Sequence, residues 1–366
     1  MKVRCVEYRQ LPLRCLLMAA VIVLPFLTKA QMQAQEDAIH VDVTAADSAA
    51  ATFSASNFRY HITTANTPAG RTALASRNLG TPFTPVKAST RTVSPALTPA
   101  TILAVPPPGF YGEDLVNLGG KFVTTAKSHP IFVNTASCGT VATCWGNPVG
   151  FLTDLSNSTF IHLTDQYLGV TTANRYPPST FVSTTVGLFV SNVVGQNEIL
   201  TMVHAAAKTL GTGYGQIYHV FLPKGVDTCF DLTSICYSPD NPASFVFCAY
   251  HGSVTFTDIG HVLFSVLPYA NVAGCQSAPP NPNSMLIDST NSLLSHELIE
   301  TITDPDGDAW ISDSSPAAAG FEIGDLCQSF TNLSGQALDP TLNLNGKNYE
   351  LQLEYSNKYH ACAGAP

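Results

Sequence analysis

His296, Glu297 and Glu300 have the spacing of a metal-binding helix, in the segment His-Glu-Leu-Ile-Glu. In the common zinc-protease motif, H-E-x-x-H, two imidazoles one helical turn apart face one metal ion, and the intervening Glu handles a water proton. Here a carboxylate, itself an accepted zinc ligand, replaces the second imidazole, and on a helix it still leaves the same face as His296. We therefore expect His296 and Glu300 to bind a metal ion, with Glu297 as general base and acid.

The third ligand is expected from the segment Gly-Phe-Glu-Ile-Gly-Asp-Leu-Cys at 320–327. Glu322 lies 22 residues after Glu300, which is similar to the zincins that take a Glu from a second helix. If 322–327 is helical, Asp325 follows one turn later, where it would hold the imidazole of His296 in its metal-binding tautomer. The alternative is a chance match, with Glu300 as an ordinary solvated helix residue.

The identity of the metal is less constrained than its ligands. Zinc is the first expectation, but an oxygen-rich ligand set also admits manganese, magnesium or calcium. Asp304, Asp306 and Asp308 alternate as in a calcium loop, yet the twelfth position, where an EF-hand needs a bidentate acid, is Ser315. A solvated turn is the competing interpretation of this loop. Asp304 and Asp325 are also alternative ligands, either of which would close the metal site.

The N-terminus indicates export. Basic residues precede an apolar run over 15–27, which predicts a secretory signal peptide at residues 1–35. No other segment has the roughly 18 uninterrupted apolar residues of a membrane span. Without residues 1–35, which carry five basic residues and one acidic residue, the net charge falls from −9 to −13. Such a chain is a poor partner for nucleic acid or an anionic membrane surface, and we expect it outside the cell, in the cell wall or in the periplasm.

Eight of the ten cysteines lie beyond the expected signal peptide. An even set in an exported chain is typical of disulfides, although eight cysteines allow on the order of a hundred connectivities. We expect near neighbours to pair, as Cys138–Cys144, Cys229–Cys236, Cys248–Cys275 and Cys327–Cys362. The alternative is a Cys/His zinc site around Cys248 and His251, for which no C-x-x-C pair speaks.

The composition predicts an Ala-, Thr-, Ser- and Pro-rich low-complexity arm at residues 36–108, followed by one large domain at 109–366. Within it we expect strands near 121–133, 185–191, 216–222, 244–256 and 261–269, and helices near 149–168, 198–210 and 284–303. This order resembles the α/β (α+β) architecture of zincin-like metalloproteases, a mixed sheet with an active-site helix, here braced by disulfides. His251 and His261 are expected on or beside an edge strand, where a substrate peptide would add as a further strand.

A set of short motifs also occurs along the chain, each of them once. They are Phe247–His251, Leu267–Tyr269, Cys275, Ser295–Glu300, Thr303–Pro305, Ala309–Trp310 and Glu322–Cys327. Together they resemble the phosphate-induced, EXORDIUM-like family of secreted proteins, with matching order and approximate spacing over about 111–362. The resemblance implies export to the cell wall or extracellular space and, in plant members, a link to growth and nutrient response. It supplies no reaction.

Three functions follow from these observations. The first is a secreted metal-dependent hydrolase, a zinc metallopeptidase acting on a peptide or protein. The second is a non-catalytic extracellular protein with a structural or degenerate metal site that binds a cell-wall polymer or another protein. The third is carbohydrate hydrolysis by Glu297 and Glu322 as a paired acid and base without metal. An open position beside Glu297 would favour the first, and closure by another protein ligand the second.

Overall fold

The computed structural model describes residues 39–43, 53–76, 114–170, 175–179, 182–186, 193–230, 234–312, 320–328 and 339–366. The chain divides into two units, Met1–Asp37 and Ala38–Pro366. The expected signal peptide at 1–35 lies outside the described residues, and everything below concerns the second unit. Among the described residues, no helix combines the length and apolar character needed to cross a membrane.

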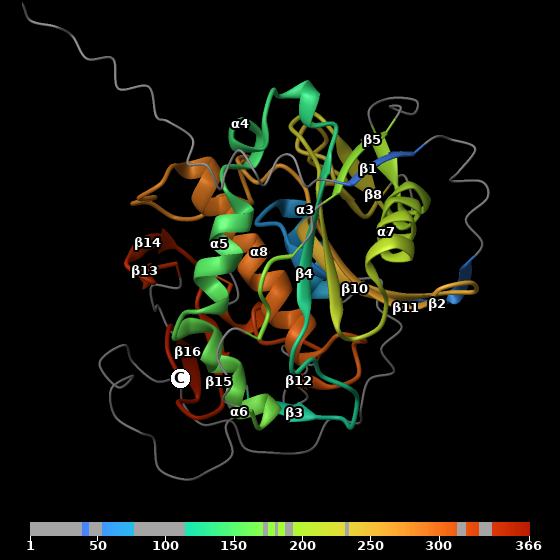
Figure 1. The fold of residues 1–366 in the computed structure, drawn as a ribbon. Coiled ribbons are helices and arrows are strands. Elements are labelled where there is room, and N and C mark those ends of the chain that lie inside the picture. Colours follow the sequence, from blue (N-terminus) through green and yellow to red (C-terminus); the bar gives the residue numbers. More distant parts are fainter. Residues whose placement is uncertain are drawn as a thin grey trace, which may run out of the picture. The chain divides into compact units, whose positions relative to one another are not determined.

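A seven-stranded mixed sheet carries the fold (Figure 1). Its strands, in spatial order, are β1 (Ile39–Val43), β5 (Val182–Val186), β4 (Lys127–Val133), β7 (Gln216–Phe221), β11 (Gly260–Leu267), β10 (Phe247–Phe256) and β2 (Phe53–Thr64). Pairing is parallel from β1 to β11 and antiparallel from β11 through β10 to β2. The central strands β7 and β10 are buried along almost their whole length, so both faces of the sheet are covered. The expected mixed α/β class is confirmed.

Strand β2 changes the expected division of the chain. Residues 36–108 are expected to form an arm outside the domain. Strands β1 and β2 and helix α3 (Pro68–Ser76) nevertheless fall in this range, and β2 pairs with β10 of the sheet. The strand is rich in aromatic and β-branched residues, which suit a half-buried sheet surface, but the surrounding Ala, Thr and Ser hide it in an averaged composition. This part of the expected arm belongs to the sheet.

The expected edge position of His251 and His261 is wrong for the same reason. β10, which carries His251, lies between β11 and β2, and β11, which carries His261, lies between β7 and β10. The terminal strand next to β10 is β2. Without β2, β10 would be the last strand of the sheet. The prediction is wrong because it did not include β2.

Helix α8 (Met285–Thr303) packs on β10 and β11, and α5 (Pro148–Ser156) packs on α8. Helix α7 (Gln196–Leu210) packs on β7 and β11 and lies on the opposite side of the sheet from α8 in Figure 1. The hydroxyl of Ser284 accepts the amide N–H of Ile287 at the start of α8, and the helix ends just before Asp304-Pro305. Every residue from 288 to 303 is buried, so α8 is a core helix.

The remaining elements are short. They are β3 (Leu115–Asn117), α4 (Val141–Trp145), α6 (Asp165–Leu168), β6 (Val193–Gly195), β8 (Asp227–Cys229), β9 (Cys236–Tyr237), β12 (Trp310–Ser312), β13 (Thr341–Leu344), β14 (Lys347–Glu350), β15 (Glu354–Ser356) and β16 (Ala361–Ala363). The expected helices at 198–210 and 284–303 and the strands at 216–222, 244–256 and 261–269 are confirmed within a few residues. The expected helix at 149–168 is α5 followed by short helical turns and α6.

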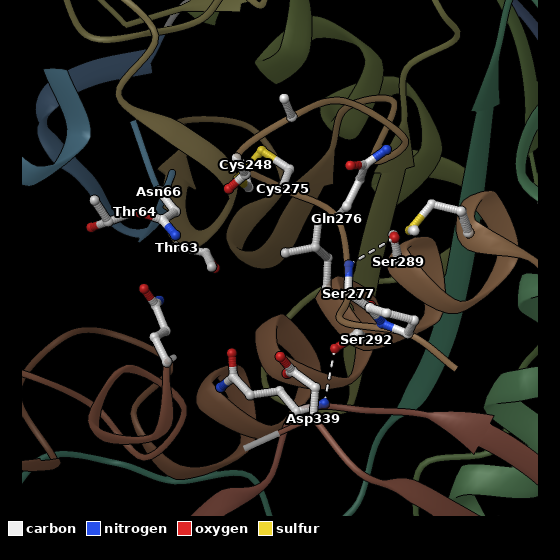
Figure 2. A pocket seen from close by; sticks show the side chains of 17 residues that line it. Thr63, Thr64, Asn66, Cys248, Cys275, Gln276, Ser277, Ser289, Ser292 and Asp339 are labelled. Atoms are coloured by element: carbon white, nitrogen blue, oxygen red, sulfur yellow. Dashed lines mark hydrogen bonds between the residues drawn. A yellow bond between two sulfur atoms is a disulfide. The ribbon is translucent and has the colours of Figure 1, made fainter. Parts of the chain in front are cut away.

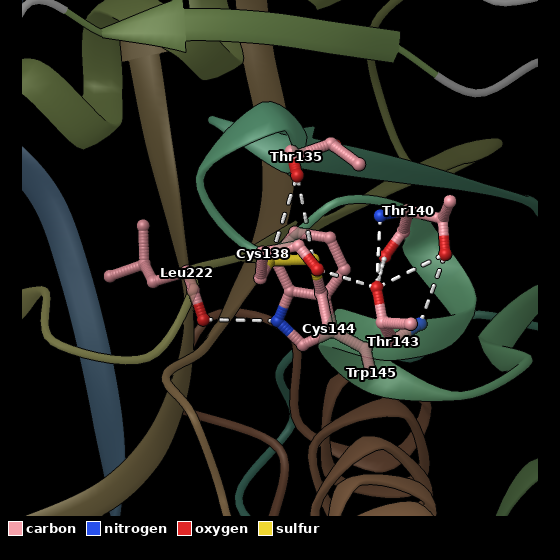
Figure 3. The surroundings of a disulfide bond; sticks show 7 residues. All are labelled: Thr135, Cys138, Thr140, Thr143, Cys144, Trp145 and Leu222. Carbon is pink, nitrogen blue, oxygen red and sulfur yellow. Dashed lines mark hydrogen bonds between the residues drawn. A yellow bond between two sulfur atoms is a disulfide. The ribbon is translucent and has the colours of Figure 1, made fainter.

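All four expected disulfides are confirmed: Cys138–Cys144, Cys229–Cys236, Cys248–Cys275 and Cys327–Cys362. The first joins Cys138, which precedes α4, to Cys144 near the end of that helix. The next residue is Trp145, whose indole N–H donates to the carbonyl of Leu222 at 3.0 Å (Figure 3). Disulfides of this number suit an extracellular protein. The Cys/His zinc site around Cys248 is excluded because its sulfur is bonded to Cys275.

Candidate metal centre

The three acidic and basic side chains of the α8 motif are all buried. His296 is 1% exposed, and Glu297 and Glu300 are not exposed at all. The expected one-turn spacing brings His296 Nε2 to 3.1 Å from Glu300 Oε1. The reading of Glu300 as an ordinary solvated helix residue is therefore wrong, and a buried carboxylate requires compensation by partners.

The segment 320–328 approaches α8 closely. The backbone N–H of Asp325 donates to Glu300 Oε1 at 3.2 Å, and an added Cβ at Gly324 would lie 2.5 Å from His296 Nδ1. Only glycine permits this approach, and the Cys327–Cys362 disulfide ties the segment to β16. The expected helix over 322–327 is only a 3-10 turn at Asp325–Cys327. Glu322 lies outside this turn, and its backbone N–H donates to Asp325 Oδ2 at 3.2 Å.

Two histidines that the sequence analysis did not assign to this site complete it. His61 on β2 and His251 on β10 are cross-strand partners with ring centroids 6.0 Å apart, and both are buried. His251 Nδ1 lies 3.3 Å from Glu297 Oε2 and 3.5 Å from Glu300 Oε2. His61 Nδ1 lies 3.2 Å from Glu322 Oε1. Three imidazoles from three elements therefore face the carboxylates of α8 and 320–328.

We call this set the histidine–carboxylate cluster. Its members are His61, His251, His296, Glu297, Glu300, Asp304, Glu322, Asp325 and Glu354. Several atoms able to bind a metal have no hydrogen-bond partner within the described structure: His61 Nδ1, His296 Nε2, Glu300 Oε2, Asp304 Oδ2 and both carboxylate oxygens of Glu322 and Glu354. Buried polar atoms are normally satisfied, so the unpartnered atoms indicate that the cluster has room for a cation partner.

Ligand atoms converge in two groups. One comprises His251, Glu297 and Glu300, and the other comprises His296, Glu300 and Asp325; within each group, one atom per residue lies within 4.8 Å of the others. Nitrogen and oxygen atoms of this kind are ligands for zinc and, as the oxygen share rises, for manganese or calcium. The structure therefore provides buried residues able to hold a metal ion.

The charges of the cluster do not balance without further positive charge. Burial lowers the pKa of His251, but contacts with Glu297 and Glu300 outweigh it and raise the pKa to about 10. Burial raises the pKa of Glu322 well above its usual range, and repulsion by Asp304 and Glu300 adds to this. With six buried carboxylates against three imidazoles, Glu322 therefore favours its protonated form when no cation compensates the cluster.

The second ring nitrogens of His251 and His296 have different partners. His251 Nε2 lies 3.3 Å from the carbonyl oxygen of Asp304; because a carbonyl only accepts, this nitrogen carries a proton and Nδ1 faces the two glutamates. A histidine that ligates a metal commonly holds its second ring nitrogen in this way. At His296, the amide nitrogen of Gln352 lies 3.0 Å from Nδ1 and donates to the carbonyl of Gly324 at 2.7 Å.

A polar pocket of about 360 Å³ borders the cluster (Figure 2). Thr63, Gln328 and Gln352 line it, and each also touches the cluster. The Thr63 hydroxyl donates to Glu297 Oε1, Gln328 donates to Asp325 Oδ1 at 3.1 Å, and Gln352 contacts His296. Across the pocket, Figure 2 shows hydroxyls of α8 opposite the end of β2. Three polar side chains therefore lie between the pocket and the cluster and contact both.

Each expected site residue can now be placed. His296 and Glu300 lie together as expected, but the third residue within ligand distance of both is Asp325. Glu322, the expected third ligand, faces His61 and lies 3.5 Å from His251 Nε2. The assignment of ligands among these residues stays a prediction.

Asp304 does not belong to a calcium loop in this arrangement. Its Oδ1 accepts the backbone N–H groups of Asp308 and Ala309 at 2.7 and 2.8 Å, whereas Asp306 contacts Tyr214 and His261. The Asp308 carboxylate forms an ion pair with Arg59. The three acids diverge, so the loop is an ordinary turn with one buried member.

The pair Glu297 and Glu322 does not suit metal-free sugar cleavage. The two carboxylates lie on opposite nitrogens of His251, at 3.3 Å from Nδ1 and 3.5 Å from Nε2. An imidazole thus occupies the space that a glycosidic bond would need.

Comparisons of the chain with protein-family models, with curated proteins and with solved structures each gave no match. The likeness to EXORDIUM-like proteins and to zincins therefore rests on the motifs of this chain.

Proposed function

We propose that this protein is an exported, metal-dependent hydrolase that cleaves peptide bonds. The observation that carries the proposal is the buried histidine–carboxylate cluster, in which several atoms able to bind a metal have no hydrogen-bond partner in the described structure and two groups of ligand atoms converge. Burying an unpaired charge lowers the stability of the fold, so a cluster of this size indicates a functional site. The motif on α8 and the adjoining polar pocket support hydrolysis as its function.

A bound zinc ion would supply a Lewis acid and lower the pKa of a water molecule to near neutrality. Glu300 is the central ligand, because both ligand groups contain it. Glu297 is the proton acceptor. Its Oε1 accepts the hydroxyl of Thr63 at the pocket wall, and burial raises its pKa, as suits a general acid and base near neutral pH.

Neighbouring side chains hold these groups in place. Gln352 fixes the ring of His296, and the carbonyl of Asp304 fixes that of His251. The backbone N–H of Asp325 orients Glu300. The loss of such a supporting contact typically lowers metal affinity or activity by about 10- to 100-fold.

The test is peptide hydrolysis by the purified protein before and after removal of metal with a chelator. We expect activity to disappear with the chelator and return with Zn²⁺, and Glu297→Gln to lose about 100-fold or more in kcat while still binding metal at His296, Glu300 and Asp325. His204→Ala on α7, where the imidazole contacts Asp258 outside the cluster, is the matched control. Unchanged hydrolysis in the chelated protein or in Glu297→Gln would contradict the proposal.

One observation favours a second candidate, a non-catalytic extracellular protein with a structural metal site. Every cluster residue is 4% exposed or less, and Asp325 joins His296 and Glu300 as a ligand that would close the site. In this reading the protein binds a cell-wall polymer or another protein, in keeping with the EXORDIUM-like resemblance. The expected result is metal that stabilises the fold with no hydrolysis of peptides in any metal state.

A further inference from the structure

The two ligand groups of the cluster share one residue, Glu300. Its carboxylate oxygens point to different imidazoles: Oε1 lies 3.1 Å from His296 Nε2, and Oε2 lies 3.5 Å from His251 Nδ1. A carboxylate that presents one oxygen to each of two ligand sets is the geometry of a bridging ligand. Two-metal hydrolytic sites hold their ions about 3.5–4 Å apart, a separation that one carboxylate spans.

Each group contributes its own further ligands. Beside Glu300, the first contains His251 and Glu297, and the second contains His296 and Asp325. The two imidazoles come from different elements, His251 from strand β10 and His296 from helix α8. A single ion bound to Glu300 and one of these imidazoles would leave the other imidazole without a metal ion between it and the carboxylates.

The charge of the cluster also exceeds what one divalent cation offsets. Six carboxylates are buried there, and both oxygens of Glu322 and of Glu354 have no hydrogen-bond partner in the described structure. Buried carboxylates are retained when they are paired or coordinate metals. Two divalent cations would offset four of the six negative charges, whereas one would offset two.

We propose that the cluster is a two-cation centre in which Glu300 bridges one divalent cation held by His251 and Glu297 and a second held by His296 and Asp325. This inference rests on the metal-binding part of the proposed function. It leaves Glu297 Oε1, which faces Thr63, available for a proton while Oε2 faces the first cation.

The experiment is equilibrium dialysis of metal-free, full-length exported protein against Zn²⁺ and, separately, against Mn²⁺, with bound metal counted by elemental analysis. We expect two equivalents per chain with at least one metal, bound in two steps. His251→Ala is expected to abolish one step and His296→Ala the other, each leaving one equivalent. His204→Ala is expected to keep both, and circular dichroism checks that each variant is folded.

The outcomes separate this inference from the proposed function. One equivalent with both metals overturns the two-cation centre and leaves a single-metal hydrolase standing. No bound metal overturns both. Two equivalents that neither histidine variant reduces would place the ions outside the cluster and overturn the inference. If one variant does not fold, the other still tests its own step.

Discussion

Gly324→Ala tests the metal centre without removing any ligand. The backbone of Gly324, at φ −77° and ψ −41°, is open to any residue, so alanine is opposed only by its neighbours. Its Cβ would lie 2.5 Å from His296 Nδ1, 2.6 Å from His296 Cε1 and 2.9 Å from Glu300 Oε1. Carbon atoms normally stay about 3.5–4.0 Å apart, so the imidazole must move by roughly 1 Å.

This displacement exceeds what a metal site tolerates. Ligand distances hold within about 0.2 Å, and displaced supporting groups weaken affinity about 10- to 100-fold. At a metal concentration about 100 times the Kd, binding stabilises the wild type by about 2.7 kcal/mol. If Gly324→Ala raises the Kd about 100-fold, the gain at that concentration falls to about 0.4 kcal/mol. Overpacking also lowers the free energy of unfolding of the metal-free protein by about 1–3 kcal/mol.

The assay is urea unfolding followed by circular dichroism, with a chelator and with Zn²⁺. Gly215→Ala is the control, because no atom lies within 4 Å of the added Cβ, and it should keep the full gain from metal. An equal gain from metal in the two variants would refute the geometry described for His296 and Glu300, even if the metal-free stability of Gly324→Ala falls.

Three further results are expected. Glu300→Gln removes the ligand that both groups share, so elemental analysis should find less than half of the wild-type metal; wild-type content would remove Glu300 from the ligand set. Loss of the Cys248–Cys275 disulfide, which spans 27 residues, should lower the free energy of unfolding by roughly 3–4 kcal/mol in denaturant titrations, and no change would contradict its structural role. Burial and the neighbouring His129 lower the pKa of His219 to about 3 from 6.5, so the unfolded chain binds the extra proton first and stability falls as the pH drops from about 6.5 toward 3. His219→Gln should flatten this pH dependence of the free energy of unfolding, and an unchanged slope would exclude His219 as its source.

The sequence pattern within short segments was enough to predict helix α8 and the four disulfides. The long apolar helix at 284–303 begins at Ser284 and stops before Pro305, and both signals are readable in the sequence. The four disulfides join cysteines that are near neighbours among the eight, 6 to 35 residues apart, because short loops close at the lowest entropic cost. These features depend on residues close in sequence.

Long-range contacts could not be read in this way. Thr63 and His61 reach α8 and the 320–328 segment across 234 and 264 residues, and only the pairing of β2 with β10 brings them there. The aromatic and β-branched run at 58–64 was the one available signal for that strand. Glu322 and Asp325 were found as candidates, but the turn that carries them is not a helix, so their relative positions were not predictable from helical spacing.

The most direct test of the metal centre is a crystal structure of the zinc-loaded protein with data collected at the zinc absorption edge. The expected result is anomalous density inside the cluster, within coordination distance of Glu300 and of His251 or His296. Well-ordered side chains at these three residues with no anomalous density among them would contradict the central claim.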